Sequence, residues 1–363
     1  MTSFDKGRQV LAIGVEQRAF PGAAFAVWND GATVATGSVG RFTYASDSAE
    51  MQPDTIFDIA SVTKVLATTA LAMRLWQSEE LPLELPVCEL LPEFSQGDPN
   101  KYLVTLKMLL AHTSGLPAHR KLYELPEVVA ASSPEASAAA ALSACFAMPL
   151  EVAPGARAEY SDIGFIVLGE ALLRLTGAAN LQEICAKEIF EPLGLTESCY
   201  LPPTNWRPRI APTRDWNWRH CVLQGEVQDE NCALLGSVSG HAGVFSSGSD
   251  LLRFAASLCE ADGFFQRETV DLFSKRVAGS RALGWDSPSA PSQSGKFFSA
   301  HSIGHLGYTG TSLWIDLERG IAIALLTNRV YTAVGAANQG IQQVRPEFHD
   351  AVMTALGISA DRR

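Results

Sequence analysis

The chain has 363 residues, 47% of them hydrophobic, and a formal net charge of -11. This length and composition suit one compact unit with a large core, and the acidic balance without a basic run argues against nucleic-acid binding and favours a small-molecule partner. No apolar run reaches the roughly 18 residues of a membrane span, and the first one, residues 10–15, is too short for a secretion signal. We therefore expect a cytoplasmic protein without membrane contact.

The N-terminal segment predicts a helix followed by a hairpin. Residues 2–16 have the apolar spacing of an amphipathic helix. Residues 22–42 contain two stretches rich in β-branched and aromatic residues, joined at Asn29-Asp30-Gly31, a sequence typical of a tight hairpin turn.

The middle of the chain has a helical pattern, with loops rich in Pro, Gly and Ser between the periodic stretches. The predicted helices cover residues 65–76, 106–111, 134–146, 165–176, 181–190 and 249–261.

The C-terminal segment predicts a second hairpin, with strands 311–317 and 321–327, and then a helix that Pro346 opens and Gly357 closes. We therefore predict an α+β fold, in which an antiparallel sheet is flanked by the N- and C-terminal helices and carries an inserted, mostly helical lobe. Residues 1–60 and 296–363 would form the sheet domain, and residues 61–295 the lobe.

A candidate nucleophile lies at the start of a predicted helix, in Ser61-Val62-Thr63-Lys64. A serine hydroxyl needs a neighbouring base, and a lysine three residues later on the same helix face is within reach. Free N–H groups at a helix start also stabilise an oxyanion. The spacing alone is weak evidence, because Ser3-Phe4-Asp5-Lys6 has it too, and an ordinary helix start stays the alternative.

Two further motifs follow in order: Tyr160-Ser161-Asp162 before a predicted helix, and His305-Leu306-Gly307 before the C-terminal hairpin. With them, the chain resembles the serine β-lactamase and DD-peptidase superfamily, specifically its class C branch with esterase and muropeptide amidase relatives. The resemblance is carried by the stretches FDIASVTKVLATTALAM, LKMLLAHTSGLP, AEYSDIGFIVLGEALLRLTG, IFEPLGL, SGHAGVFSSGSDLLRF and HLGYTGTSLWIDLERGIAIALLTN.

The resemblance implies that Ser61 attacks a carbonyl carbon and that Lys64 and Tyr160 exchange its proton. His305 stands where the family usually has a lysine, and the backbone N–H groups of Ser61 and Tyr308 would form the oxyanion hole. No cofactor is implied, and no residue pattern predicts a metal site.

Three departures from the family bear on the substrate. Asp162 replaces a frequent Asn. It would raise the pKa of Lys64, leaving Tyr160 as the general base, or cap the helix that follows, and the two roles are compatible. His305 would be mostly neutral at pH 7 and would give the pH profile a limb near roughly pH 6 to 7. Leu306 replaces a hydroxyl residue that commonly meets a β-lactam carboxylate.

Other residues are candidates for the substrate pocket. Gly307 belongs to the third motif, and the resemblance places the loops of His241 and Glu230 near the active-site mouth. A packed histidine and a solvated charge are the alternatives for these two. We expect His112 to be structural. Three tryptophans wall the cleft or pack in the core: Trp206, Trp216 and Trp218.

The leading hypothesis is a serine hydrolase that opens an ester or amide bond through an acyl-enzyme, as a β-lactamase-like esterase with weak or no β-lactamase activity. One alternative is an amidase or peptidase acting on peptidoglycan-derived muropeptides, and another is a non-catalytic ligand-binding protein. The seven cysteines form no CxxC pair, so we expect reduced, buried thiols.

Overall fold

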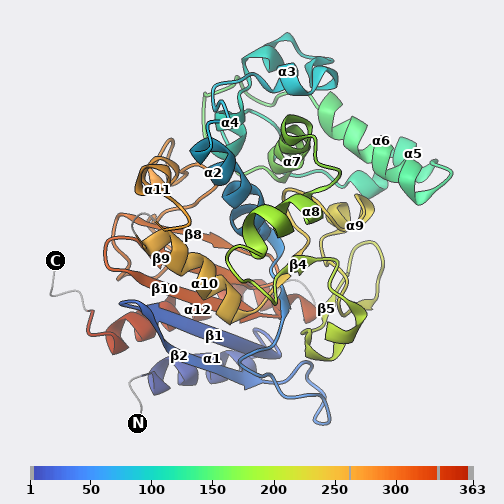
Figure 1. The fold of residues 1–363 in the computed structure, drawn as a ribbon. Helices are drawn as coiled ribbons and strands as arrows, with labels where there is room; N and C mark the ends of the chain where they lie inside the picture. Colours follow the sequence, from blue (N-terminus) through green and yellow to red (C-terminus); the bar gives the residue numbers. More distant parts are fainter. Residues whose placement is uncertain (1–3, 261–262, 333–335, 359–363) are drawn as a thin grey trace.

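The protein is described by a computed structural model that covers residues 4–260, 263–332 and 336–358. Its centre is a five-stranded antiparallel sheet of order β2-β1-β10-β9-β8 (Figure 1). The strands are β1 (Gly22–Asn29), β2 (Ala32–Gly40), β8 (Ser302–Leu306), β9 (Ser312–Asp316) and β10 (Ile321–Thr327). Because β1 pairs with β10, both ends of the chain build one sheet, and the predicted α+β architecture is confirmed.

Helices cover both faces of this sheet, so its central strands are buried on both sides. Side chains alternate along a strand. Phe25 and Ile323 face a cluster formed with the paired helices α1 (Asp5–Glu16) and α12 (Ala336–Ala355). Their neighbours Ala24 and Ala324 face the main core of the lobe, where α10 (Gly248–Cys259) packs on β1 and β10.

The C-terminal helix differs from its prediction, because α12 runs through Pro346 instead of starting there. A proline in a helix interior removes one backbone hydrogen bond. Burial of Ile341, Val344, Phe348 and Val352 in the cluster against the sheet offsets that loss. The predicted end is confirmed, since Gly357 follows the helix with φ +80°.

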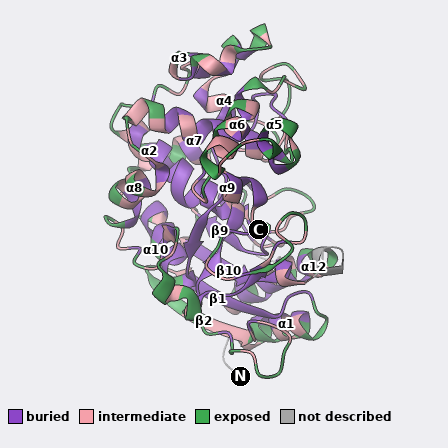
Figure 2. Cartoon of the chain, turned by 90° about the vertical axis from the view of Figure 1, so that its right-hand side faces the viewer, coloured by how far each residue is buried: buried purple, intermediate pink, exposed green. Residues whose placement is uncertain are grey.

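The helical lobe lies over the face of the sheet opposite to α1 and α12, and the interior of the lobe is buried (Figure 2). The predicted helices are present, although residues 64–69 and 186–190 wind as π-helix. The division at residues 60 and 296 stays a prediction. None of the helices within the described ranges is long and apolar enough to cross a membrane. The remaining elements are α2 (Ala70–Gln77), α3 (Val87–Leu90), α4 (Leu106–Leu110), α5 (Pro126–Val129), α6 (Pro134–Ala147), α7 (Asp162–Thr176), α8 (Leu181–Cys185), α9 (Glu230–Leu234), α11 (Arg267–Ser274), β3 (Phe57–Asp58), β4 (Cys199–Tyr200), β5 (Thr213–Arg214), β6 (Val222–Leu223) and β7 (Val244–Ser246).

Candidate active site

Ser61 lies in a strained turn directly after β3. The turn is a 3₁₀ segment, Ala60–Val62, which leads into the helical residues 64–69. Ala60 has φ +46°, a left-handed conformation that costs a non-glycine residue about 1 kcal/mol or more. The buried Asp58 carboxylate holds it there, accepting hydrogen bonds from Ala60 N (2.9 Å) and Gln228 N (2.7 Å). The turn thereby presents Ser61 to a cavity.

Lys64 lies behind Ser61 with its side chain fully buried. Its ammonium donates to Ser61 Oγ (3.2 Å), Asp162 Oδ1 (2.7 Å) and His241 O (3.0 Å), which uses all three of its donors. Burial alone would lower the pKa of Lys64, but the adjacent Asp162 and Tyr160 outweigh it and the pKa is raised. The predicted effect of Asp162 on Lys64 is therefore confirmed.

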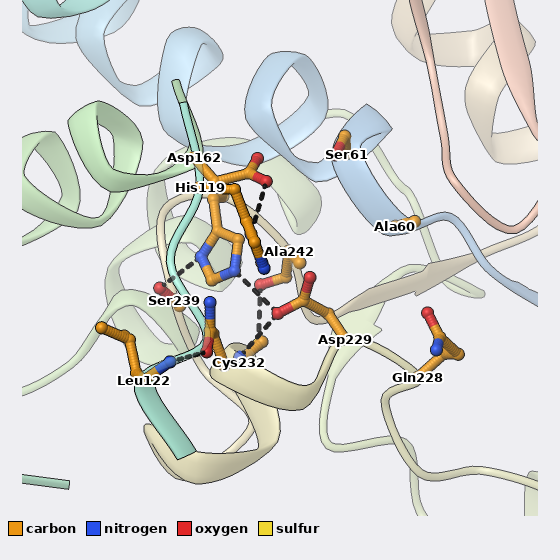
Figure 3. Close-up of polar contacts among 12 residues, drawn as sticks. Ala60, Ser61, His119, Leu122, Asp162, Gln228, Asp229, Cys232, Ser239 and Ala242 are labelled. Carbon is orange, nitrogen blue, oxygen red and sulfur yellow. Dashed lines mark hydrogen bonds and ion pairs between the residues drawn. The ribbon is translucent and has the colours of Figure 1, made fainter. Parts of the chain in front are cut away.

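Asp162 faces the cavity because another residue caps its helix. Ser161 Oγ accepts from Gly164 N (2.9 Å) at the start of α7, so the alternative that Asp162 is the cap is wrong. Burial would raise the pKa of Asp162, but Lys64 and His119 hold it well below its usual range. His119 Nδ1 lies 3.6 Å from Asp162 Oδ2 (Figure 3). The sequence reading missed His119, an exposed loop residue without a motif.

The Tyr160 ring lies near two cationic side chains and two histidine rings. Lys64 Nζ lies 5.0 Å and the Arg281 guanidinium carbon 5.3 Å from the centroid of the Tyr160 ring. The His112 and His305 rings lie 4.8 Å and 5.9 Å from it, centroid to centroid. Burial raises the pKa of Tyr160 to about 12, so the resting phenol is protonated.

His305 is buried on β8 beside Tyr160. Its Nδ1 lies 2.8 Å from Leu306 O, and since a carbonyl only accepts, Nδ1 carries the proton and donates. Burial, with Lys64 and Arg281 nearby, lowers the pKa of His305 to about 3. The ring is neutral at pH 7, as predicted. The lowered pKa argues against the predicted His305 limb near pH 6 to 7, because the desolvated ring lies beside two cations.

The turn after β8 packs against the nucleophile turn. Thr309 Oγ1 donates to Asp58 O (2.8 Å), and Thr311 Oγ1 donates to Ile59 O (3.0 Å). Gly307 permits this approach, because a Cβ there would lie 2.5 Å from Ile59 O. Ser61 and Tyr308, whose N–H groups are the candidate oxyanion donors, consequently border the same cavity.

The cavity of about 550 Å³ brings most of the predicted site together. Its lining includes Ser61, Tyr160, Asp162, Glu230, His305, Gly307 and Tyr308, with His119, Arg281, Arg329 and Arg345. Glu230 Oε1 accepts from Asn217 Nδ2 (2.8 Å), and burial raises the pKa of this carboxyl group. The interpretation of Glu230 as a solvated charge is therefore wrong.

His241 was predicted as a lining residue and is not one. Its side chain is buried, with Nδ1 2.9 Å from Ser239 Oγ and Nε2 2.9 Å from Asp229 Oδ1, two residues shown in Figure 3. Both ring nitrogens are satisfied within the lobe, and the next residue, Ala242, borders the cavity instead. His241 contributes to the site through its carbonyl group, which binds Lys64.

Three arginines of the cavity were missed, and Arg345 of α12 is the most deeply placed. It is 4% exposed, and its guanidinium donates to Gln293 Oε1 (3.0 Å) and Thr311 O (3.4 Å). No ion pair to it occurs within the described ranges. Burial and the charge of Arg329 lower its pKa to about 9. The sequence signal for Arg345 is its position on the apolar face of a helix, between Ile341 and Phe348.

The tryptophans pack and do not line the cavity. Trp218 stacks on Tyr123, a lining residue, at 5.5 Å between centroids. Trp216 Nε1 donates to Val330 O (3.0 Å), and Trp206 packs on a small apolar cluster.

The remaining predictions concern His112, the cysteines and metal binding. His112 is structural, as expected, since its Nδ1 accepts from Ser161 N (3.1 Å). All seven cysteines are free, but Cys221 is exposed, contrary to the expectation of buried thiols. The part of the chain that the structure describes contains no cluster of residues able to hold a metal ion.

The comparisons with known proteins agree with this geometry. The profile of the beta-lactamase family matches residues 8–344. The chain is 32% identical over 349 residues to an N-acetylmuramyl-L-alanine amidase of Bacillus subtilis (strain 168), covering 87% of this chain and 78% of that protein. It is 30% identical over 308 residues to a putative D-alanyl-D-alanine carboxypeptidase of Escherichia coli (strain K12), covering 77% and 70%.

Solved structures show the same fold. EstCE1, a hydrolase with promiscuous acyltransferase activity, superposes with a TM-score of 0.74 at 18% identity, covering 94% of this chain and 98% of that one. The family profile spans nearly the whole chain, and the two relatives are named as an amidase and a putative carboxypeptidase. The chain therefore belongs to the beta-lactamase family and is a serine hydrolase.

Proposed function

We propose that the enzyme cleaves an amide bond in a carboxylate-bearing, peptidoglycan-derived peptide. The observation that carries this proposal is Arg345, a buried cation at the cavity whose hydrogen-bond acceptors are neutral. A buried charge without a counter-ion is unfavourable, and a substrate carboxylate would supply that counter-ion. Arg329 lines the same cavity. The amidase relative from Bacillus subtilis supports the substrate class.

In the proposed reaction Tyr160 first loses its phenolic proton to solvent, and Ser61 Oγ then attacks the amide carbonyl carbon while its proton moves to the Tyr160 phenolate oxygen. Lys64 stays protonated, because Asp162 holds its charge, and it stabilises the phenolate. The N–H groups of Ser61 and Tyr308 stabilise the oxyanion. Tyr160 then protonates the leaving nitrogen, and water hydrolyses the acyl-enzyme by the same route in reverse.

An unpaired negative charge at Asp162 would disfavour a substrate that carries a carboxylate. In the structure that charge is paired with Lys64, and the arginines add positive charge to the cavity. A carboxylate substrate is therefore better matched than the sequence indicated. We still expect turnover of short aryl esters, because they are activated substrates. We also still expect weak turnover of β-lactams, because Leu306 replaces a hydroxyl donor.

The test is a turnover panel of N-acetylmuramoyl-L-alanyl-D-glutamate, p-nitrophenyl acetate and a chromogenic cephalosporin. We expect release of the free dipeptide from the first compound and slow cephalosporin opening. Ester turnover without dipeptide release would refute the amidase and leave an esterase. Failure of a fluorophosphonate to label Ser61 would favour a non-catalytic binding protein.

We also propose a cytoplasmic location. The seven free cysteines support it, because free thiols are typical of reducing compartments. Cell fractionation with an antibody against the protein tests it.

A further inference from the structure

The charge environment of Tyr160 raises a question that the family pattern does not answer. Tyr160 can accept the proton of Ser61 only after it has lost its own proton, so a phenolate must first form in a buried site, and cations must stabilise it. The charged and titratable groups around the ring are Lys64, Asp162, Arg281, His112 and His305. Only two of them, Lys64 and Arg281, are cations.

Lys64 supplies part of this stabilisation, but its ammonium is shared with Asp162 at 2.7 Å. The Asp162 carboxylate raises the pKa of Tyr160 and so opposes formation of a second anion there. His305 gives no charge, because its Nδ1 proton is committed to Leu306 O and its Nε2 is buried without a described partner. The position that usually holds a lysine in the family is therefore neutral here.

Arg281 reaches this region from a loop joined to the edge of β8. Asp286 and Gly304 exchange two backbone hydrogen bonds of 2.9 Å, and Arg281 pairs with Asp286 in turn. This bridging brings Arg281 next to the strand that carries His305. Arg281 Nη1 lies 3.6 Å from Asp286 Oδ2, and the guanidinium carbon lies 5.3 Å from the centroid of the Tyr160 ring. Its side chain is 22% exposed and borders the cavity.

We propose that Arg281 is the permanent cation that assists proton transfer at Tyr160. His305 cannot take this role, because its ring carries no charge. The step conserves atoms and charge: Tyr160 first gives its phenolic proton to solvent, and the Ser61 proton then moves to the phenolate oxygen as the Ser61 oxygen bonds to the carbonyl carbon. The negative charge passes to the carbonyl oxygen, and Arg281 keeps its charge throughout. The inference rests on the proposed function only in taking Ser61 and Tyr160 as the reacting pair. It is independent of the substrate's carboxylate.

The test is steady-state kinetics of Arg281→Gln and Arg281→Lys on p-nitrophenyl acetate. This ester has no carboxylate, so an effect on it cannot come from substrate anchoring. Because a nearby cation favours an anion by roughly tenfold or more, we expect Arg281→Gln to lower kcat at least tenfold with KM within about twofold. Arg281→Lys should keep at least about a third of wild-type kcat. The exposed Arg276→Gln is the matched control and should leave both constants unchanged.

The double variant Arg281→Gln/His305→Lys moves the cation to position 305 and should recover at least about fivefold of the lost kcat. The inference is overturned if Arg281→Gln keeps its kcat, if only KM changes, or if Arg281→Lys is as impaired as Arg281→Gln. If the double variant does not fold by circular dichroism, the Gln and Lys variants decide. Full activity of Ser61→Ala would refute the proposed function, whereas an inactive Ser61→Ala beside a normal Arg281→Gln refutes only this inference.

Discussion

Lys64 and Arg345 are buried cations on two sides of the cavity, and they differ in their partners. On the lobe side, Lys64 donates to Asp162 and Ser61, and Asp162 also meets His119, so each charge has a partner within the protein. On the sheet side, Arg345 is equally buried but donates only to neutral oxygens.

This difference separates two tasks. The lobe side has its charges in place before substrate arrives, as proton transfer requires, because a preorganised group needs no rearrangement during the reaction. Arg345 reaches charge balance only with an anionic ligand. Substitutions of the Lys64–Asp162 pair should therefore affect kcat or stability, and substitution of Arg345 should affect KM.

The largest expected effect is the loss of the nucleophile. Ser61→Ala should reduce turnover of every substrate below about 1% of wild type, because removing one member of a cooperating unit removes most of its effect. Ser3→Ala, in the second Ser-x-x-Lys sequence, is the control and should keep full activity. Initial rates with p-nitrophenyl acetate measure both. Substantial activity of Ser61→Ala would identify another nucleophile.

Removal of Asp162 should cost stability, because it leaves Lys64 charged and buried. We expect Asp162→Ala to lower the free energy of unfolding by about 3 to 5 kcal/mol in urea. The exposed pair Lys107–Glu84 gives the contrast, and Glu84→Ala should change it by less than about 1 kcal/mol. Equal costs for the two variants would contradict a difference between buried and surface pairs.

The pH dependence of this pair has a defined sign. The folded pKa of Asp162 is lowered, so its stabilisation is complete above its ordinary pKa of about 4 and is lost as the pH falls further. The folded pKa of Lys64 is raised, so its part is complete below about pH 10 and is lost at higher pH. The stability difference between wild type and Asp162→Ala should be largest between these limits.

On the sheet side, Arg345→Gln should raise KM for a carboxylate substrate by about tenfold or more, which corresponds to a lost charged hydrogen bond. For p-nitrophenyl acetate the KM should change little. The exposed Arg8→Gln on α1 is the control. An equal rise of KM for both substrates would show a structural effect instead of carboxylate binding.

The smallest expected effect concerns the two histidines. Asp162 raises the pKa of His119, whereas burial lowers that of His305 to about 3. Any limb of the kcat profile between pH 6 and 8 (roughly the histidine range) should therefore persist in His305→Gln and disappear in His119→Gln. The reverse result would show that His305 titrates in the active enzyme.

The sequence predicted those features that depend on local spacing. The hairpin at Asn29-Asp30-Gly31 follows from turn chemistry, and the motifs of Ser61, Tyr160 and His305 occupy one cavity. Features set by tertiary packing could not be predicted in this way. Pro346 continues a helix because the surrounding apolar side chains are buried, and Arg281 reaches the site through a bridge to β8 that no local pattern encodes.

The pairing of β1 with β10 has a consequence for the order in which the molecule assembles. Ala23 lies opposite Thr327, so the central sheet joins segments from opposite ends of the chain. During synthesis β1 and β2 leave the ribosome long before their partner exists, and the hairpin must wait with an open edge. Such long-range pairing is slow to form. The strand that carries His305 joins the same sheet, so catalytic competence should appear late in biosynthesis, and nascent chains shortened before β10 should remain inactive.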